Sequence, residues 1–212
     1  MTQDISYADY ALIDLLDAFA SNEPLPGGGS AAAATAALGV SLLLMVAGLP
    51  KTRSGPDVPE EAADLAQASA RLRPLRDRLV ELIDRDSQAY RALIEAYRRP
   101  KASDDDRIAR SAAIQEGMRA ATEVPLETMR ECQQALAGAV IVARNGHRPA
   151  ASDAGVAVEL LTAALRGSAL NVDTNLAAVT DQTFCDRVRT ERNQLAADGT
   201  ADAERARQSL RA

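Results

Sequence analysis

The amino-acid sequence predicts an all-α protein, a helical bundle packed around one buried, Ala-rich helix. Aromatic residues make up only 3% of the 212 residues and tryptophan is absent, whereas strands favour β-branched and aromatic side chains. Over most of the chain, apolar residues recur at intervals of three and four, which is the spacing of one helical face. Residues 31–49 contain no charged side chain, so this segment is expected to be the central helix.

The charge and the cysteine content argue against several classes of function. The formal net charge is -6, and sequence-independent nucleic-acid binding needs a basic surface. Two cysteines and one histidine, without a Cys-x-x-Cys pair, predict neither a disulfide framework nor a metal site. The chain does not begin with a positively charged and then apolar leader, so a cytoplasmic location is expected.

Three helices are expected in the first half of the chain. An amphipathic helix should begin at Ser6, and residues 23–30 should form a loop with two prolines and three glycines. The central helix and a basic loop follow. Pro59 is then expected to open a long helix that reaches about Arg98 and is kinked or divided at Pro74.

The second half of the chain should also be helical. Ser103 is placed to cap a helix that ends near Thr122, and Pro125 should break the pattern and open another helix. Ser152 is placed to cap the next helix.

The C-terminal residues are charged and poor in large apolar groups, which is typical of a frayed helical tail. We therefore predict one domain over residues 1–195 and a charged helical tail over residues 196–212.

The uncharged segment 31–49 is also long enough to cross a bilayer. This interpretation is rejected, because the segment is rich in Ala and Gly rather than Leu and Ile, stands alone and lacks aromatic anchors. The small residues instead suit a helix that neighbouring helices approach closely.

One acidic residue lies in a stripe of leucines. Leu79, Leu82, Asp86 and Leu93 fall on one face of the predicted helix, and burial of a carboxylate raises its pKa unless it is paired or solvated. Asp86 could point outward or pair with an arginine. Alternatively, it could be a carboxylate with a tuned pKa in an interhelical cleft, available for acid or base catalysis.

The glycine-rich stretch before the central helix is a second candidate site. Residues 26–30 could present free amides to an anion or a polar ring at a helix N-terminus, although a simple sharp turn would explain them too. Lys51 and Arg53, which follow the central helix, could hold a carboxylate-bearing ligand tail or could simply be solvated.

Two asparagines and the single histidine are further candidates. Asn171 and Asn175 lie four residues apart on one helical face, where their amides could bind a heterocycle or could set helix register. His147 follows a predicted helix end, and it is either solvent-exposed or close enough to a pocket to titrate usefully near neutral pH.

Six short motifs occur in an order that resembles a known family. They are Pro-Gly-Gly-Gly-Ser at 26–30, Leu-Ile-Asp-Arg-Asp-Ser-Gln-Ala-Tyr at 82–90, Ala-Ile-Gln at 113–115, Val-Pro-Leu at 124–126, Ser-Asp-Ala-Gly-Val at 152–156 and Asn-Val-Asp-Thr-Asn-Leu at 171–176. Together they resemble the cyclodeaminase/cyclohydrolase family, which includes the C-terminal domain of formiminotransferase-cyclodeaminase and stand-alone methenyltetrahydrofolate cyclohydrolases.

The resemblance implies a helical bundle that forms a homodimer, binds a folate, and needs neither a metal nor another cofactor. It also implies that the second acid of the Asp-x-Asp pair, which is Asp86 here, is the catalytic residue. We expect the substrate to contact Pro26, Gly27, Gly28, Gly29, Ser30, Lys51, Arg53, His147, Ser152, Asp153, Asn171 and Asn175.

The expected activity is the reversible hydrolysis of 5,10-methenyltetrahydrofolate to 10-formyltetrahydrofolate. Two alternatives stay open. One is cyclodeamination of formiminotetrahydrofolate with release of ammonia, and the other is a non-catalytic helical dimer that only binds folate. No nucleic-acid or membrane partner is expected.

Overall fold

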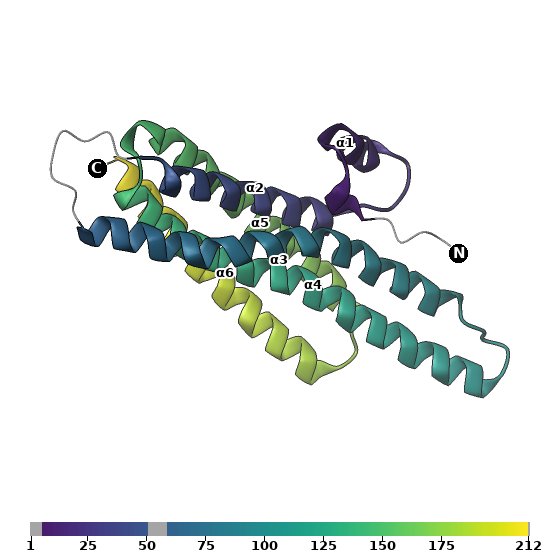
Figure 1. Ribbon diagram of the computed structural model, residues 1–212. Helices are drawn as coiled ribbons and strands as arrows, with labels where there is room; N and C mark the ends of the chain where they lie inside the picture. Colours follow the sequence, from purple (N-terminus) through teal and green to yellow (C-terminus); the bar gives the residue numbers. More distant parts are fainter. Residues whose placement is uncertain (1–5, 51–58, 212) are drawn as a thin grey trace.

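The protein is all-α, as its sequence predicts (Figure 1). The computed structural model describes residues 6–50 and 59–211, and no β-strand occurs among them. The elements are, in order, η1 (Tyr7–Asp9), α1 (Leu12–Ala20), α2 (Gly28–Gly48), α3 (Pro59–Arg98), α4 (Asp104–Asn145), η2 (Arg148–Ala150), α5 (Ala151–Leu176) and α6 (Gln182–Arg211). Figure 1 shows α2 to α6 as an elongated bundle, with α1 standing apart from it.

The Ala-rich helix α2 packs against α3, α4 and α5. Its most deeply buried residues are small or branched, among them Ala33, Ala36, Val40 and Leu43. The contact with α5 is close at Gly39, because a Cβ there would lie 3.1 Å from the carbonyl oxygen of Ala157. A side chain there would push against the backbone of α5, so the small residues of α2 set how closely the two helices approach.

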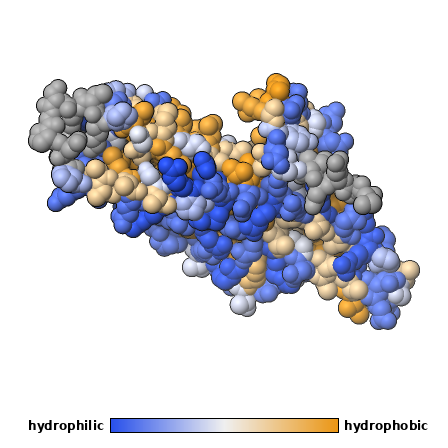
Figure 2. Space-filling model, in the orientation of Figure 1, coloured by the Kyte–Doolittle hydropathy of each residue, from blue (hydrophilic) through white to orange (hydrophobic). Residues whose placement is uncertain are grey.

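One face of α2 is left open by the other helices of this chain. It is uncharged along its whole length and consists of Ala31, Ala34, Thr35, Leu38, Leu42 and Met45. Leu38 is 55% exposed and Met45 is 41% exposed. Figure 2 shows hydrophobic surface along this edge of the bundle and on α1. By length and composition alone α2 could cross a membrane, and 44% of its most apolar window is buried.

Neither interior proline divides its helix. The expected break at Pro125 is wrong, because α4 is one continuous helix. A proline removes the hydrogen bond to the carbonyl four residues earlier. The carbonyl of Ala121 instead accepts a hydrogen bond of 2.7 Å from Nδ2 of Asn175 on α5. At Pro74 the freed carbonyl belongs to Ala70, an exposed residue that water can hydrate, and α3 is also not divided.

Three helix starts differ from the predictions. The N-terminal segment forms the 3-10 turn η1 before α1 begins at Leu12. Two of the three glycines belong to α2, which begins at Gly28. Ser152 does not cap α5, because α5 begins at Ala151 and its N-cap residue is Ala150.

The predicted start of α4 is confirmed. Ser103 accepts a hydrogen bond of 3.0 Å from the amide of Asp106, and the Asp106 carboxylate accepts one of 3.1 Å from the amide of Ser103. This reciprocal pair is a capping box, which satisfies two amides at the helix N-terminus.

The C-terminal segment is not frayed. Helix α6 continues to Arg211 and packs against α4 and α5, and it buries Gly199, Asp202, Ala203 and Ala206. These small residues recur at helical spacing and allow close packing without large apolar side chains. Residues 196–211 are therefore part of the packed bundle.

Candidate active site

Asp86 caps helix α2 from the neighbouring helix α3. The N-cap residue of α2 is Gly27, which has no side chain that could accept a hydrogen bond. The amide of Ser30 donates instead to Oδ2 of Asp86 over 2.9 Å. This amide is one of those that a helix N-terminus leaves without an intrahelical acceptor. The positive end of the α2 dipole in turn favours the negative charge of the carboxylate.

The hydroxyl of Ser30 strengthens this connection between α2 and α3. It lies 3.1 Å from Oδ2 of Asp86, 2.8 Å from the Ile83 carbonyl oxygen and 3.2 Å from the Ser87 hydroxyl. With one hydrogen, it can donate to only one of these oxygens at a time. Oδ2 of Asp86 is thus engaged, whereas Oδ1 accepts no hydrogen bond from any residue that the structure describes.

The surroundings of Asp86 change the basicity of its carboxylate. Burial raises the pKa of Asp86, although the side-chain and backbone hydrogen bonds from Ser30 act in the opposite direction. A carboxylate with a raised pKa is a stronger base than an ordinary aspartate. The open oxygen Oδ1 is therefore suited to accept a proton.

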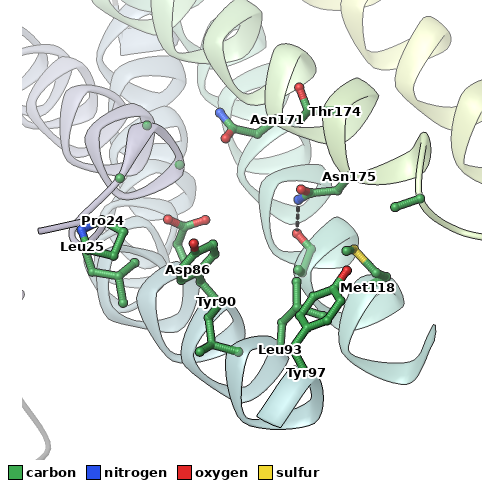
Figure 3. A pocket seen from close by; sticks show the side chains of 16 residues that line it. Pro24, Leu25, Asp86, Tyr90, Leu93, Tyr97, Met118, Asn171, Thr174 and Asn175 are labelled. Carbon is green, nitrogen blue, oxygen red and sulfur yellow. Dashed lines mark hydrogen bonds between the residues drawn. The ribbon is translucent and has the colours of Figure 1, made fainter. Parts of the chain in front are cut away.

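Asp86 faces a cleft of about 410 Å³, a volume typical of sites for small organic ligands (Figure 3). Helix α3 forms one wall, the turn before α2 forms the second, and α4 and α5 form the third. The lining residues are Pro24, Leu25, Gly27, Gly28, Gly29, Asp86, Tyr90, Leu93, Ile94, Tyr97, Met118, Ala121, Asn171, Thr174, Asn175 and Ala178. The cleft is thus mostly apolar, with one carboxylate and a few amide and hydroxyl groups.

The two candidate asparagines both line this cleft. Asn175 has a structural role as well, since its Nδ2 holds the carbonyl that Pro125 frees. Nδ2 of Asn171 donates to the Gly167 carbonyl of its own helix over 2.9 Å. No described residue donates a hydrogen bond to Oδ1 of Asn171, so this oxygen can accept one from a ligand.

The first acid of the Asp-x-Asp pair has a different role. Oδ1 of Asp84 accepts a hydrogen bond of 2.6 Å from the backbone amide of Tyr7. Asp84 thereby attaches η1 to α3, and it does not line the cleft.

The glycine-rich turn divides into residues that line the cleft and residues behind it. Gly27, Gly28 and Gly29 line it, whereas Pro26 and Ser30 are buried and do not. Lys51 and Arg53 lie outside the described residues.

His147, Ser152 and Asp153 are not brought to this cleft. Gly146, the neighbour of His147, lies against Val46 near the C-terminal end of α2, where its added Cβ would be 3.0 Å from Val46 Cγ1. A helix of 21 residues is about 30 Å long, so this contact is far from the N-terminal end of α2 where Asp86 lies. Ser152 and Asp153 begin α5, whereas the cleft residues of α5 are near its other end. A role for these three residues in binding stays a prediction.

Several cleft residues were missed by the sequence reasoning. Tyr90, Leu93, Ile94 and Tyr97 follow Asp86 on one face of α3 and line the same wall. Their spacing of four, seven, eight and eleven residues from Asp86 was a usable signal. Met118 and Thr174 carried no comparable signal, because only the packing of α4 and α5 brings them to the cleft.

Among the described residues, no group of three or more His, Cys, Asp or Glu side chains could hold a metal ion. The fold and the cleft thus define an all-α protein with a single partly buried carboxylate at a helix N-terminus, open to a pocket for a small organic molecule. Such an arrangement suits proton transfer to or from a bound ligand.

Comparison with known proteins identifies the family. A sequence profile described as formiminotransferase-cyclodeaminase matches residues 11–194, and the chain belongs to this family. The methenyltetrahydrofolate cyclohydrolase of Methylorubrum extorquens is 40% identical over 190 residues, which are 90% of this chain and 90% of that protein. The formimidoyltransferase-cyclodeaminase of Sus scrofa is 34% identical over 86% of this chain, which spans only 34% of that longer protein.

The fold is also known from a solved structure. The crystal structure of formiminotetrahydrofolate cyclodeaminase from Thermotoga maritima has a TM-score of 0.84 to this chain at 23% identity, and the match covers 96% of both chains. This similarity confirms the helical bundle.

Proposed function

We propose that this protein is an enzyme that hydrolyses 5,10-methenyltetrahydrofolate to 10-formyltetrahydrofolate and catalyses the reverse closure. The 40% identity to a methenyltetrahydrofolate cyclohydrolase over nine-tenths of both chains supports this activity. The observation that carries the mechanism is Asp86, which lines the cleft (Figure 3). Its Oδ2 is held by Ser30, and its Oδ1 accepts no hydrogen bond from a described residue.

The chemistry of the substrate matches such a site. The reacting carbon bridges two nitrogens in a cationic amidine, which is already electrophilic. A partly buried carboxylate beside this carbon stabilises the positive charge, because electrostatic interactions are strong where water is excluded. No cofactor is required for this step in our proposal.

Asp86 then acts as the general base. A water molecule adds to the bridging carbon as Oδ1 takes one of its protons, which gives a neutral tetrahedral carbinolamine. The bond from this carbon to N5 then breaks, the hydroxyl proton of the carbinolamine passes to N5, and the resulting formyl group stays on N10. Overall, the amidine cation and water give 10-formyltetrahydrofolate, whose one-carbon unit is uncharged, and one proton, which leaves through Asp86.

The rest of the cleft suits a pterin. Its ring would lie between the glycine-rich turn and α5, where a ring N–H can donate to Oδ1 of Asn171. The exposed aromatic rings of Tyr90 and Tyr97 continue the same wall away from Asp86 and offer apolar surface to the rest of the substrate.

The assay follows the loss of methenyl absorbance on addition of pure protein, above the uncatalysed rate. We expect Asp86→Asn to lower kcat by about 10²- to 10⁴-fold, because general-base catalysis contributes about that much, and to raise KM as well, because the carboxylate also stabilises the bound cation. Asp77→Asn is the matched control, since Asp77 is an exposed acid on the same helix. An Asp86→Asn enzyme with wild-type kcat would contradict the mechanism.

Cyclodeamination is the second candidate, favoured by the match to the formiminotransferase-cyclodeaminase profile. The same carboxylate could serve as N10 attacks the formimino carbon and ammonia leaves. Release of ammonia from 5-formiminotetrahydrofolate, without hydrolysis of the methenyl compound, would select this activity. Folate binding without turnover of either compound would instead indicate a non-catalytic folate-binding protein.

We further propose that the protein is a cytoplasmic homodimer that binds neither membranes nor nucleic acid. The open face of α2 is uncharged and carries exposed Leu38 and Met45, and such a surface is normally covered in a soluble protein. A second copy is the occupant that we favour over lipid, because α3 beside it exposes many Arg, Asp and Glu side chains that a bilayer would reject.

Sedimentation measurements test the dimer. We expect the wild type to sediment as a dimer and Leu38→Glu to shift it to the monomer, because a charge would enter the apolar contact. Ile108→Glu is the control, since Ile108 is 68% exposed on α4 and is not part of the α2 face. A monomeric wild type would overturn the dimer proposal.

A further inference from the structure

The cleft at Asp86 lacks a group that could bind the acidic end of a folate. Among the residues that the structure describes, no Lys or Arg lines this cleft, and the carboxylate of Asp86 is its one charged group. Folates carry a glutamate tail with two carboxylates, and these would be repelled by Asp86. The tail of a bound folate is therefore expected outside this cleft, near a cation.

A second cleft adjoins the first and contains two arginines. It has a volume of about 170 Å³ and shares Pro24, Leu25, Tyr90 and Ile94 with the Asp86 cleft. Its other lining residues are Arg91, Glu95 and Arg98. Successive residues of a helix point about 100° apart, so Arg91 faces the far side of the ridge formed by Tyr90 and Ile94. We call this second cavity the Arg91 cleft.

Arg91 is positioned without an ion pair. Its Nη2 donates to the hydroxyl oxygen of Tyr7 over 3.3 Å, and its guanidinium lies 5.9 Å from the centre of the Tyr7 ring. The backbone of Tyr7 is itself held by Asp84. No carboxylate among the described residues forms a salt bridge with Arg91, so its charge is available to a ligand.

Arg98 is paired, but weakly. It donates to Glu95 over 2.6 Å, and the two side chains are 70% and 66% exposed. Exposed pairs of this kind contribute little to stability. Arg98 can therefore release Glu95 and bind a carboxylate of a ligand instead. The three charged groups of the Arg91 cleft, which are Arg91, Glu95 and Arg98, have a net charge of +1.

We propose that Arg91, assisted by Arg98, binds the carboxylates of the substrate's glutamate tail. The pterin and the reacting carbon lie in the Asp86 cleft, and the aromatic linker of the folate crosses the Tyr90 and Ile94 ridge beneath Leu25. A guanidinium and a carboxylate form charge-assisted, often bidentate hydrogen bonds, which makes arginine suited to this role. This inference rests on the proposed function.

The test compares two substrates that differ only in the tail. One is 5,10-methenyltetrahydrofolate, and the other is the corresponding methenyltetrahydropteroate, which lacks the glutamate. We expect Arg91→Gln to raise KM for the folate by about 10- to 100-fold and to leave kcat within twofold, because hydrogen bonds to charged groups contribute about that much. For the pteroate we expect no change in either parameter. Arg98→Gln should act in the same direction with a smaller effect.

Two matched variants separate tail binding from structural effects. Arg99→Gln removes the same charge next to Arg98, from a residue that does not line the Arg91 cleft, and it should leave both substrates unaffected. Tyr7→Phe removes only the hydroxyl that Arg91 contacts. If Arg91→Gln and Tyr7→Phe both raise KM equally for the folate and for the pteroate, the effect is structural and the inference is overturned.

Other outcomes are also decisive. If Arg91→Gln raises KM equally for the folate and the pteroate, Arg91 does not recognise the tail. The inference also fails if the double variant Lys51→Gln/Arg53→Gln loses the preference for the folate while Arg91→Gln keeps it. Equilibrium binding of tetrahydrofolate and tetrahydropteroate is measured in parallel. If neither substrate is turned over, the proposed function fails, whereas an Arg91-dependent preference for tetrahydrofolate in binding would still support the tail site.

Discussion

Gly29→Ala tests whether the position of the Asp86 carboxylate controls activity. A Cβ at Gly29 would lie 2.5 Å from Cγ and 2.8 Å from Oδ2 of Asp86, and closer still to Oδ1. Carbon atoms in good contact are about 3.5–4.0 Å apart. The carboxylate must therefore retreat by about 1 Å from α2, which breaks its hydrogen bonds with Ser30.

This displacement should affect activity far more than stability. A misplacement of about 1 Å at a reacting group can cost about 10²-fold in rate, so we expect kcat/KM to fall by about that factor. Loss of a hydrogen bond to a charged group costs about 1.5–3 kcal/mol, and the better helix propensity of alanine offsets up to about 1 kcal/mol. The net destabilisation of about 0.5–3 kcal/mol is below the stability of about 5–15 kcal/mol that is typical of proteins, so the protein stays folded at 25 °C.

The assay measures methenyl hydrolysis and thermal unfolding on the same preparations. Gly48→Ala is the control, because Gly48 is in the same helix and an added Cβ there meets nothing within 4 Å. It should keep wild-type kcat/KM. The reasoning is refuted if Gly29→Ala is as active as the wild type, or if its activity falls only in proportion to the unfolded fraction.

Three further variants test the electrostatics and the hydrogen bonds. Burial raises the pKa of Asp86, so the folded protein is less stable when this carboxylate is ionised. Asp86→Asn removes the charge and should therefore raise Tm at pH 8. This gain should disappear below the ordinary pKa of an aspartate, where the carboxyl group is protonated in the folded and the unfolded protein. A gain that is constant with pH would contradict this cause. Ser103→Ala should cost about 1 kcal/mol in thermal unfolding and leave kcat unchanged, because it removes only the cap of α4. Asn175→Ala should cost about 1–3 kcal/mol in denaturant unfolding, since the Ala121 carbonyl loses its partner. An unchanged unfolding midpoint would show that water replaces the amide.

Helix content and the main helix boundaries could be predicted from sequence, because they depend on local periodicity and capping. Pro59 and Arg98 bound α3 as expected, and Ser103 caps α4. The continuity of α4 could not be predicted, because it depends on a partner 54 residues away for the carbonyl that Pro125 frees. The packing of residues 196–211 was missed for another reason: its buried residues recur at helical spacing, but most of them are alanine or glycine, which are weak markers of a buried face.

The candidate site was predictable only in part. An acid within a leucine stripe can be detected from spacing alone, and this observation led to Asp86. The spacing did not show that Asp86 would cap another helix, because that contact depends on how α2 and α3 cross. It also gave no means to place the other candidates along α2: His147, proposed because it follows a predicted helix end, lies near the end of α2 remote from Asp86, and its role in binding stays a prediction.

The hydrogen bonds of Asp86 with Ser30 and of Asn175 with Ala121 form for the same physical reason. At the start of α2, backbone amides lack acceptors, and a carboxylate from α3 supplies one. Within α4, the Ala121 carbonyl lacks a donor because of Pro125, and an amide from α5 supplies one. In both cases a backbone group left unpaired in one helix forms a hydrogen bond with a side chain of another helix, and both hydrogen bonds lie at the wall of the same cleft. Asp86 and Asn175 are therefore fixed by the bundle before a ligand arrives, and fixed polar groups of this kind are what a site for a cationic amidine requires.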